Sequence, residues 1–421
     1  MTESAVSVIA LLVLAWAVLS GALARHDVTG PLVFTVAGFL LAHPDWGPLT
    51  VNIETGAIHT LAEVTLALVL FSDAARVNVA ELRRDVTLPL RLLGVGLPLT
   101  MVFGGLVAAL LFGDFSWALV GYVAAALAPT DAALSVQVIN DERVPLRLRR
   151  GLNVESGLND GIVTPVVTLM LALAASQLGI QAESEAYVVG AALRELGLGL
   201  VTGLVLGLAG AAAINAAARH GWAATGGHRI ATFAAAIAAF TVAVAIDGNG
   251  FIAAFVAGIA FGAVLDQELL EVEQAVELPE LGGELLALIV WFLFGATLVP
   301  IGFDHLSVAV IGYALLSLTA IRMLPVVLSM AGSGLDRTSV LFMAWFGPRG
   351  LASVVFALLA IEQLGVQGEE AVAVVAMTVL LSVFLHGVTA GPAGRYLGRT
   401  GIREASGDGL RARPRVFRQA S

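Results

Sequence analysis

Long apolar stretches, separated by short polar segments, follow one another along almost the whole chain. A helix that crosses a membrane needs about 20 apolar residues, and fewer where the bilayer thins or neighbouring helices bury it. The pattern predicts thirteen spans, of which the second, ninth and tenth are short, and therefore an all-α membrane protein. The predicted spans are residues 5–24, 30–43, 56–75, 88–112, 115–134, 152–177, 196–218, 230–246, 250–265, 284–299, 308–330, 339–360 and 371–391.

The composition agrees with lipid as the solvent of these segments. Hydrophobic residues make up 58% of the 421 positions and charged residues 13%, whereas a soluble domain is about a quarter charged. A soluble chain of this length could not bury so much apolar surface. The first apolar stretch is interpreted as a retained helix and not as a cleaved signal peptide, because residues 1–4 contain a glutamate and no positive charge.

Residue types that the sequence lacks exclude several classes of function. The chain has no cysteine, which excludes disulfides, thiolate metal sites and cysteine nucleophiles. All 22 basic residues are arginine, so Schiff-base chemistry and a P-loop lysine are excluded too. The net charge of −10 argues against a nucleic-acid partner. We expect no cofactor.

Arginine placement tests the predicted spans independently, because positive residues collect in cytoplasmic loops. With thirteen spans, all but Arg194, Arg322 and Arg349 fall on one side of the membrane. We therefore expect the N-terminus outside and the C-terminus in the cytoplasm. The acidic cytoplasmic segment 266–284 is interpreted as a solvated amphipathic linker, and residues 392–421 as a short arginine-rich tail on anionic lipid.

Two prolines mark breaks at equivalent places in the two halves of the chain. Span five contains Pro129 followed by Thr130 and Asp131, and span twelve contains Pro348 followed by Arg349. Proline removes a backbone donor, and broken helices at matching positions are typical of inverted-repeat transporters. Two ordinary kinked helices are the alternative. Unwound helices leave charged ends in the membrane, which the aspartate and the arginine can neutralise.

We accordingly expect one transmembrane domain, residues 1–391, of about thirteen helices. Two inverted six-helix repeats would occupy about 5–177 and 230–391, with residues 196–218 as the helix that links them. Spans five and twelve would be the broken crossing helices. Charges inside spans are costly and mark a pathway or a binding site by default.

The start of the sixth span carries four polar side chains on one face. Their spacing of i, i+1, i+4 and i+5 places them on the same side of a helix. A hairpin between spans five and six would bring Asp131 close to this face. Carboxylate, hydroxyl and carbonyl oxygens suit a hard cation and argue against a transition metal. The four residues are Glu155, Ser156, Asn159 and Asp160.

Together these motifs resemble the monovalent cation:proton antiporter family. Within that family, the motifs resemble the bacterial and archaeal NhaP-type sodium/proton antiporters, which are relatives of the animal sodium/proton exchangers. It rests on Pro129-Thr130-Asp131 followed by Glu155-Ser156-x-x-Asn159-Asp160, on Arg322 after Thr-Ala-Ile, and on Gly347-Pro348-Arg349-Gly350. The resemblance extends from the third span to the last.

The resemblance implies which residues bind the ion. Asp160 would be the main carrier of either a cation or a proton. Asp131, Ser156 and Thr130, the last through its backbone carbonyl, would complete the shell around Na⁺. An acidic ligand in the family's third helix corresponds to Asp73, for which a helix-end charge beside Arg76 is the alternative.

The resemblance also implies supporting residues. Glu155 would pair with Arg322 as an internal brace, since an unpaired buried charge is costly. Asn159 occupies the neutral first position of the Asn-Asp pair. Arg349 is interpreted as structural, with gating of access as the alternative. The histidines His43, His59 and His386 are interpreted as satisfying local polar groups, with pH sensing as the alternative.

The function that we expect is secondary active exchange of Na⁺, or of Li⁺ or K⁺, for protons. It would proceed by alternating access around one carboxylate site that cation and proton share, electroneutrally at one cation per proton. The protein would be a homodimer in the inner (plasma) membrane of a prokaryote, and not an enzyme. A sodium-coupled solute symporter is an alternative. An intramembrane aspartyl protease is disfavoured, because neither aspartate has the G-x-G-D signature.

Overall fold

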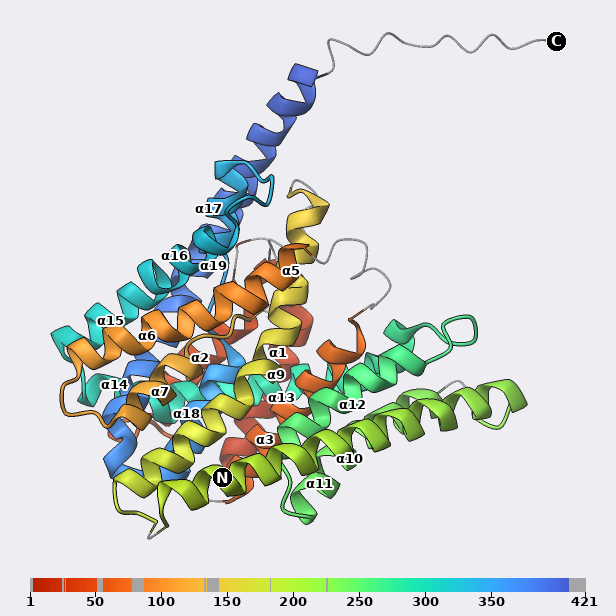
Figure 1. Cartoon of the computed structure of the whole chain (residues 1–421), viewed down its shortest axis with the longest axis horizontal. Helices are drawn as coiled ribbons and strands as arrows, with labels where there is room; N and C mark the ends of the chain where they lie inside the picture. Colours follow the sequence, from red (N-terminus) through yellow and green to blue (C-terminus); the bar gives the residue numbers. More distant parts are fainter. Residues whose placement is uncertain are drawn as a thin grey trace.

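The computed structural model describes residues 3–24, 26, 28–50, 56–77, 87–131, 134, 144–181, 183–224 and 226–408. Within these ranges the protein consists of helices joined by turns and short extended segments, without strands (Figure 1). Several arginines that served to predict the topology lie outside the described residues: Arg25, Arg83, Arg84, Arg143 and those beyond residue 408.

All thirteen predicted spans coincide with helices. Nine helical stretches of the described chain are long and apolar enough to cross a membrane, and α2, α7 and α12 are shorter apolar helices. Segments η1 and η3 are π-helical and η4 is a 3₁₀ turn. The elements are α1 (Glu3–Ala24), α2 (Gly30–Ala42), α3 (Gly56–Ala75), α5 (Thr87–Arg91), η1 (Leu92–Gly96), α6 (Leu97–Leu111), α7 (Trp117–Ala126), α9 (Leu146–Gln177), α10 (Glu185–His220), α11 (Gly227–Ala245), α12 (Gly250–Val264), α13 (Val272–Leu293), η3 (Phe294–Leu298), α14 (Val299–Asp304), α15 (Val308–Leu318), α16 (Ala320–Ser329), α17 (Arg337–Trp345), α18 (Leu351–Leu364), η4 (Gly365–Gly368) and α19 (Glu369–Asp408).

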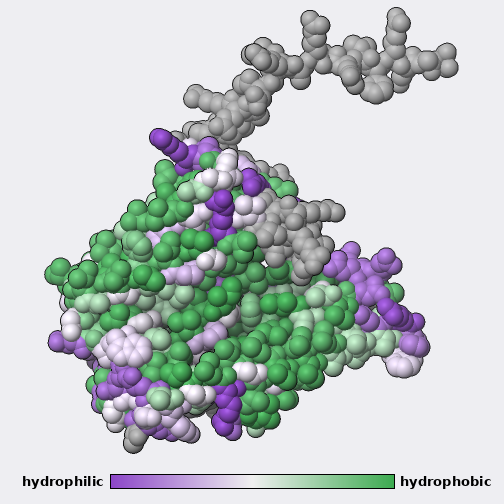
Figure 2. All heavy atoms as spheres, viewed as in Figure 1, coloured by the Kyte–Doolittle hydropathy of each residue, from purple (hydrophilic) through white to green (hydrophobic). Residues whose placement is uncertain are grey.

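The outer surface is that of a membrane protein. Apolar side chains cover most of the face seen in Figure 2, and hydrophilic residues gather toward its ends. Large apolar side chains point outward from several helices; Leu14 of α1 and Leu110 of α6 are 59% and 83% exposed. Lipid can cover such side chains, because helices satisfy their own backbone groups.

Helices extend further than the predicted spans at their polar ends. The segment expected to be a solvated amphipathic linker, residues 266–284, contains the start of α13 at Val272. Val272, Ala275 and Val276 are buried and pack with residues of α3 and α11, so an apolar stripe holds this acidic turn of helix against the bundle. The last helix likewise continues past residue 391 to Asp408.

Glycines bring α12 against α3. A Cβ on Gly258 would lie 2.4 Å from the carbonyl oxygen of Phe71, and one on Gly262 would lie 2.1 Å from that of Ala75. Side chains at these two positions would force the helices apart. The C-terminal half of α3, which carries Asp73, is therefore fixed by close contact with its neighbour.

Both predicted helix breaks are present, and they touch. α7 ends at Ala126 and continues as non-helical chain to Asp131, while residues 346–350 separate α17 from α18. The Asp131 N–H donates to the carbonyl oxygen of Pro348 at 2.9 Å. α7 and α18 also pack together, and Tyr122 Oη donates to the carbonyl oxygen of Phe356 at 3.2 Å. The inverted relation of the two repeats stays a prediction.

Candidate functional site

A buried arginine and an aspartate lie where the two breaks cross. Arg349 is fully buried, and its Nη1 donates to the carbonyl oxygens of Ala128 at 2.7 Å and Pro129 at 3.0 Å. Asp131 Oδ2 accepts the N–H of Leu351, the first residue of α18, at 2.8 Å. The Arg349 guanidinium thus lies at the negative, C-terminal end of α7. The Asp131 carboxylate lies at the positive, N-terminal end of α18.

Helix α9 fixes the first break through Thr130. Ser156 Oγ donates to the carbonyl oxygen of Thr130 at 2.6 Å, and Asn159 Nδ2 donates to Thr130 Oγ1 at 2.7 Å. All three residues are buried. Because the Ser156 hydroxyl donates its proton, its own lone pairs remain for a further ligand. Helical spacing along α9 thus brings Ser156 and Asn159 to the residue expected to share the ion.

Asp160, on the same face of α9, has an available carboxylate. It is half-buried, and within the described structure its side chain makes no hydrogen bond or ion pair. The carboxylates of Asp131 and Asp73 are close enough to act on it electrostatically. Its backbone carbonyl accepts a bond from Thr164 Oγ1 at 2.7 Å. The contact of Asp160 with its own helix thus uses its backbone carbonyl. Its carboxylate oxygens can therefore bind an ion or a proton.

Asp73 faces the same helix from α3. A Cβ on Gly157, three residues before Asp160 on α9, would lie 3.5 Å from the Cβ of Asp73. Arg76, the partner in the alternative interpretation, makes a two-pronged ion pair with Glu280 of α13 instead. The placement favours Asp73 as a member of the site, and its role as a ligand stays a prediction.

Glu155 and Arg322 form a buried ion pair with two hydrogen bonds. Arg322 Nη1 lies 2.6 Å from Glu155 Oε1 and Nη2 lies 2.9 Å from Oε2, and each side chain is 1% exposed. A Cβ on Gly347 would lie 2.4 Å from Arg322 Nε, so the glycine makes room for the guanidinium. The pair joins α9 to α16 beside the second break.

Sequence reasoning did not single out two serines that also hold the breaks. Ser353 Oγ donates to the carbonyl oxygen of Ala126 at 2.6 Å, and Ser382 Oγ accepts the N–H of Arg349 at 2.7 Å. Their signal is a hydroxyl in an apolar span. That signal is weak, because such hydroxyls commonly bond their own helix, as Thr378 does.

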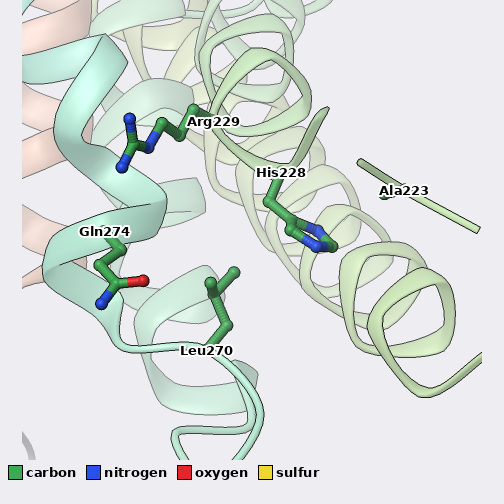
Figure 3. Close-up of a pocket in the computed structure, with 5 residues that line it drawn as sticks. All are labelled: Ala223, His228, Arg229, Leu270 and Gln274. Atoms are coloured by element: carbon green, nitrogen blue, oxygen red, sulfur yellow. The ribbon is translucent and has the colours of Figure 1, made fainter. Parts of the chain in front are cut away.

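A surface pocket of about 230 Å³ lies apart from these residues, between the start of α11 and the start of α13 (Figure 3). Arg229 extends from its wall toward α13, where it pairs with Glu277 at 2.8 Å. Among the described residues, no three histidine or carboxylate side chains are gathered as a metal centre requires. The pocket is lined by Ala223, His228, Arg229, Leu270 and Gln274.

Comparison with known proteins agrees with this geometry. Two structures of the sodium proton antiporter MjNhaP1 from Methanocaldococcus jannaschii are similar to this chain at 17% sequence identity. The first, at pH 8, has a TM-score of 0.75 and covers 94% of this chain and 99% of its own. The second, an electron-microscopy map, has a TM-score of 0.72 and covers 94% and 98%. At this identity they show that the fold is shared. The sequence profile described as "Sodium/hydrogen exchanger, transmembrane" matches residues 8–395. The chain therefore belongs to the sodium/hydrogen exchanger family.

Proposed function

We propose that this protein exchanges Na⁺ for H⁺ across a membrane and that Asp160 binds either ion. The observation that supports this role most directly is the setting of Asp160, a half-buried carboxylate without an internal partner among the described residues. A bound cation stabilises the ionised carboxylate, and a bound proton removes the charge that attracts the cation. The two ions therefore compete for the same oxygens.

Neighbouring oxygens would complete the shell around Na⁺. The carbonyl oxygen of Thr130 and the hydroxyl of Ser156 are 2.6 Å apart. Asp131, which follows Thr130 in the chain, and Asp73, whose Cβ lies against α9, would be further oxygen donors. These are hard oxygen donors, which suit a small alkali cation. Li⁺ and K⁺ are the other candidates of this class.

Transport would proceed by alternating access around this site. We propose that the crossed breaks and α9 move together, since direct hydrogen bonds connect them, against a scaffold of other helices. The moving bundle would face each side in turn with either a cation or a proton bound. The scaffold would form a homodimer.

The charges at the site favour one cation per proton. Glu155 is neutralised by Arg322, Asn159 does not titrate, and Asp131 is held by the N-terminus of α18. Asp160 is then the one carboxylate that exchanges its proton for a cation. The moving bundle would carry the same charge in both directions, so the cycle would be electroneutral.

The decisive experiment uses proteoliposomes that contain a pH-sensitive dye, challenged in turn with Na⁺, Li⁺ and K⁺. Wild type should move protons when Na⁺ alone is added, and Asp160→Asn should not, although it inserts and folds. Asp114→Asn, in the exposed turn after α6, is the matched control and should transport normally. A protease would move no protons, and a symporter would need a solute. Transport by folded Asp160→Asn would overturn the proposal.

The arginine distribution supports an N-terminus outside and a C-terminus in the cytoplasm of a prokaryotic cell. The lack of cysteine makes this easy to test, since any introduced cysteine is unique. With a membrane-impermeant maleimide, Asp114→Cys should react in intact cells. Ala331→Cys, in the exposed turn after α16, should react after permeabilisation alone. The reverse pattern would invert the topology.

A further inference from the structure

Helix α19 presents a row of polar side chains to the second helix break. Ser382, His386 and Thr389 follow i, i+4 and i+7 spacing, which places them on one face. Ser382 is 0% and His386 is 1% exposed, so both polar side chains are buried among apolar neighbours of the span. α19 packs against both α17 and α18 (Figure 1), the two helices that the break separates.

Each member of this row bonds to the break. Ser382 Oγ accepts the N–H of Arg349 at 2.7 Å, two residues before α18 begins. His386 Nε2 lies 3.0 Å from the carbonyl oxygen of Trp345, the last residue of α17. Thr389 Oγ1 accepts the indole N–H of Trp345 at 3.0 Å. Backbone groups at a break have no helical partner and no water in lipid, so α19 supplies a partner on each side of the gap.

Both ring nitrogens of His386 have hydrogen-bond partners. Ser382 Oγ receives the Arg349 N–H, so its own proton can point to His386 Nδ1, which lies 3.2 Å away. Nδ1 also lies 3.0 Å from the carbonyl oxygen of Ser382, one turn earlier in α19, and Nε2 lies 3.0 Å from the carbonyl oxygen of Trp345. The result is a connected set of contacts across the break, from Arg349 through Ser382 and His386 to Trp345.

We propose that His386, acting with Ser382, is a positioning residue for cation exchange. The break that these two residues hold is the one that holds Asp131. Asp131 N–H donates to Pro348 and Asp131 Oδ2 accepts from Leu351, the residues on either side of Arg349 along the chain. A shift of the break would therefore move the Asp131 carboxylate relative to Asp160. This inference rests on the proposed function, because it assigns a distant residue to that same site.

The test separates positioning from simple packing by measuring the Michaelis constant for Na⁺ in proteoliposomes, with rates normalised to folded, inserted protein. His386→Leu keeps bulk and removes both ring nitrogens, and Ser382→Ala removes one oxygen. Each should raise the Michaelis constant by about two- to tenfold, the equivalent of one hydrogen bond. His386→Gln, which retains an N–H for the Trp345 carbonyl, should recover part of the loss. The double variant His386→Leu, Ser382→Ala should have a Michaelis constant no higher than that of the more impaired single variant, since both substitutions interrupt the same set of contacts.

Thr378→Val is the matched control. Thr378 is equally buried and lies one turn before Ser382, but its hydroxyl bonds its own helix at the carbonyl of Val374. Its Michaelis constant should equal that of wild type. An unchanged constant in Ser382→Ala would overturn the inference, even if His386→Leu fails to fold. Wild-type protein that moves no protons with Na⁺ would instead overturn the proposed function, so the two failures are distinguishable.

Discussion

The side chain of Asp131 caps the helix that begins after Arg349, and the side chain of Arg349 caps the helix that ends before Asp131. The first contact is the bond from the N–H of Leu351 to Asp131 Oδ2 at 2.8 Å, and the second is the bond from Arg349 Nη1 to the carbonyl of Ala128 at 2.7 Å. Each break thus supplies the charge that stabilises the other. Sliding one break past the other would lose both contacts, so we expect the two to move as a unit.

Gly350 should be essential to this crossing. A Cβ there would lie 1.8 Å from Asp131 Oδ2, a distance that no repacking of a single carboxylate can relieve without moving the break. We expect Gly350→Ala to abolish Na⁺-driven proton flux in proteoliposomes. Gly113→Ala, in a turn where a Cβ would meet no atom within 4 Å, is the control. Normal flux in Gly350→Ala would contradict the described crossing.

The Glu155–Arg322 pair should be costly to break from one side. Arg322→Ala leaves a buried carboxylate without its partner and should lose about 3–5 kcal/mol of unfolding free energy. The double variant Glu155→Gln, Arg322→Gln should recover part of that loss. Unfolding in detergent measures both, and strictly additive losses would rule out the coupling.

A surface pair offers the comparison for that result. Arg76 and Glu280 are joined by two hydrogen bonds as well, but their side chains are 34% and 30% exposed. Solvent screens such a pair, so Arg76→Ala should cost about 1 kcal/mol or less in the same unfolding assay. Equal losses in Arg76→Ala and Arg322→Ala would show that burial does not determine how much unfolding free energy is lost when one partner of an ion pair is removed.

Competition at Asp160 has a kinetic signature. As pH falls, protons occupy the carboxylate more often, so the Michaelis constant for Na⁺ should rise. Saturating Na⁺ should restore nearly the same maximal rate at moderate acidity. Initial rates over a matrix of pH and Na⁺ concentration measure this. A Michaelis constant independent of pH would indicate separate sites for the two ions.

Electroneutral exchange should be indifferent to membrane potential. Each net charge moved would feel about 2.3 kcal/mol per 100 mV, which changes rates visibly. With K⁺ and valinomycin setting the potential, initial Na⁺-driven proton fluxes should be the same at zero and at about ±100 mV. A voltage-dependent rate that Asp73→Asn abolishes would identify Asp73 as a second titrating group.

Hydropathy predicted the spans well because it is a local property of the chain. The third span, for example, has the same ends as α3. The start of α13 was missed because glutamates interrupt its apolar stripe; Glu273 is exposed, and Glu277 pairs with Arg229 of α11. Pro129 and Pro348 likewise predicted the breaks, since the loss of a backbone donor is local too.

The site was predictable only as far as helical spacing reaches. That spacing grouped Ser156 and Asn159 on one face, but which atoms they would meet on Thr130 depends on packing between separate helices. His386 could not be told from a histidine that satisfies its own helix, because its partner Trp345 lies 41 residues away in sequence. Contacts between residues so far apart in the chain leave no periodic pattern in the sequence.

The crossing of the breaks also sets the order in which the protein can be completed. Leu351 follows Asp131 by 220 residues, which at about 5–20 residues per second takes the ribosome roughly 10 to 40 seconds. Until then, the carbonyls of Ala128 and Pro129 lack the guanidinium that satisfies them in the finished fold, and hydrocarbon offers no substitute. We therefore expect that the first half of a nascent chain does not settle fully in the membrane by itself. On this expectation, its fifth span stays at the translocon or in contact with water until the twelfth span has been synthesised.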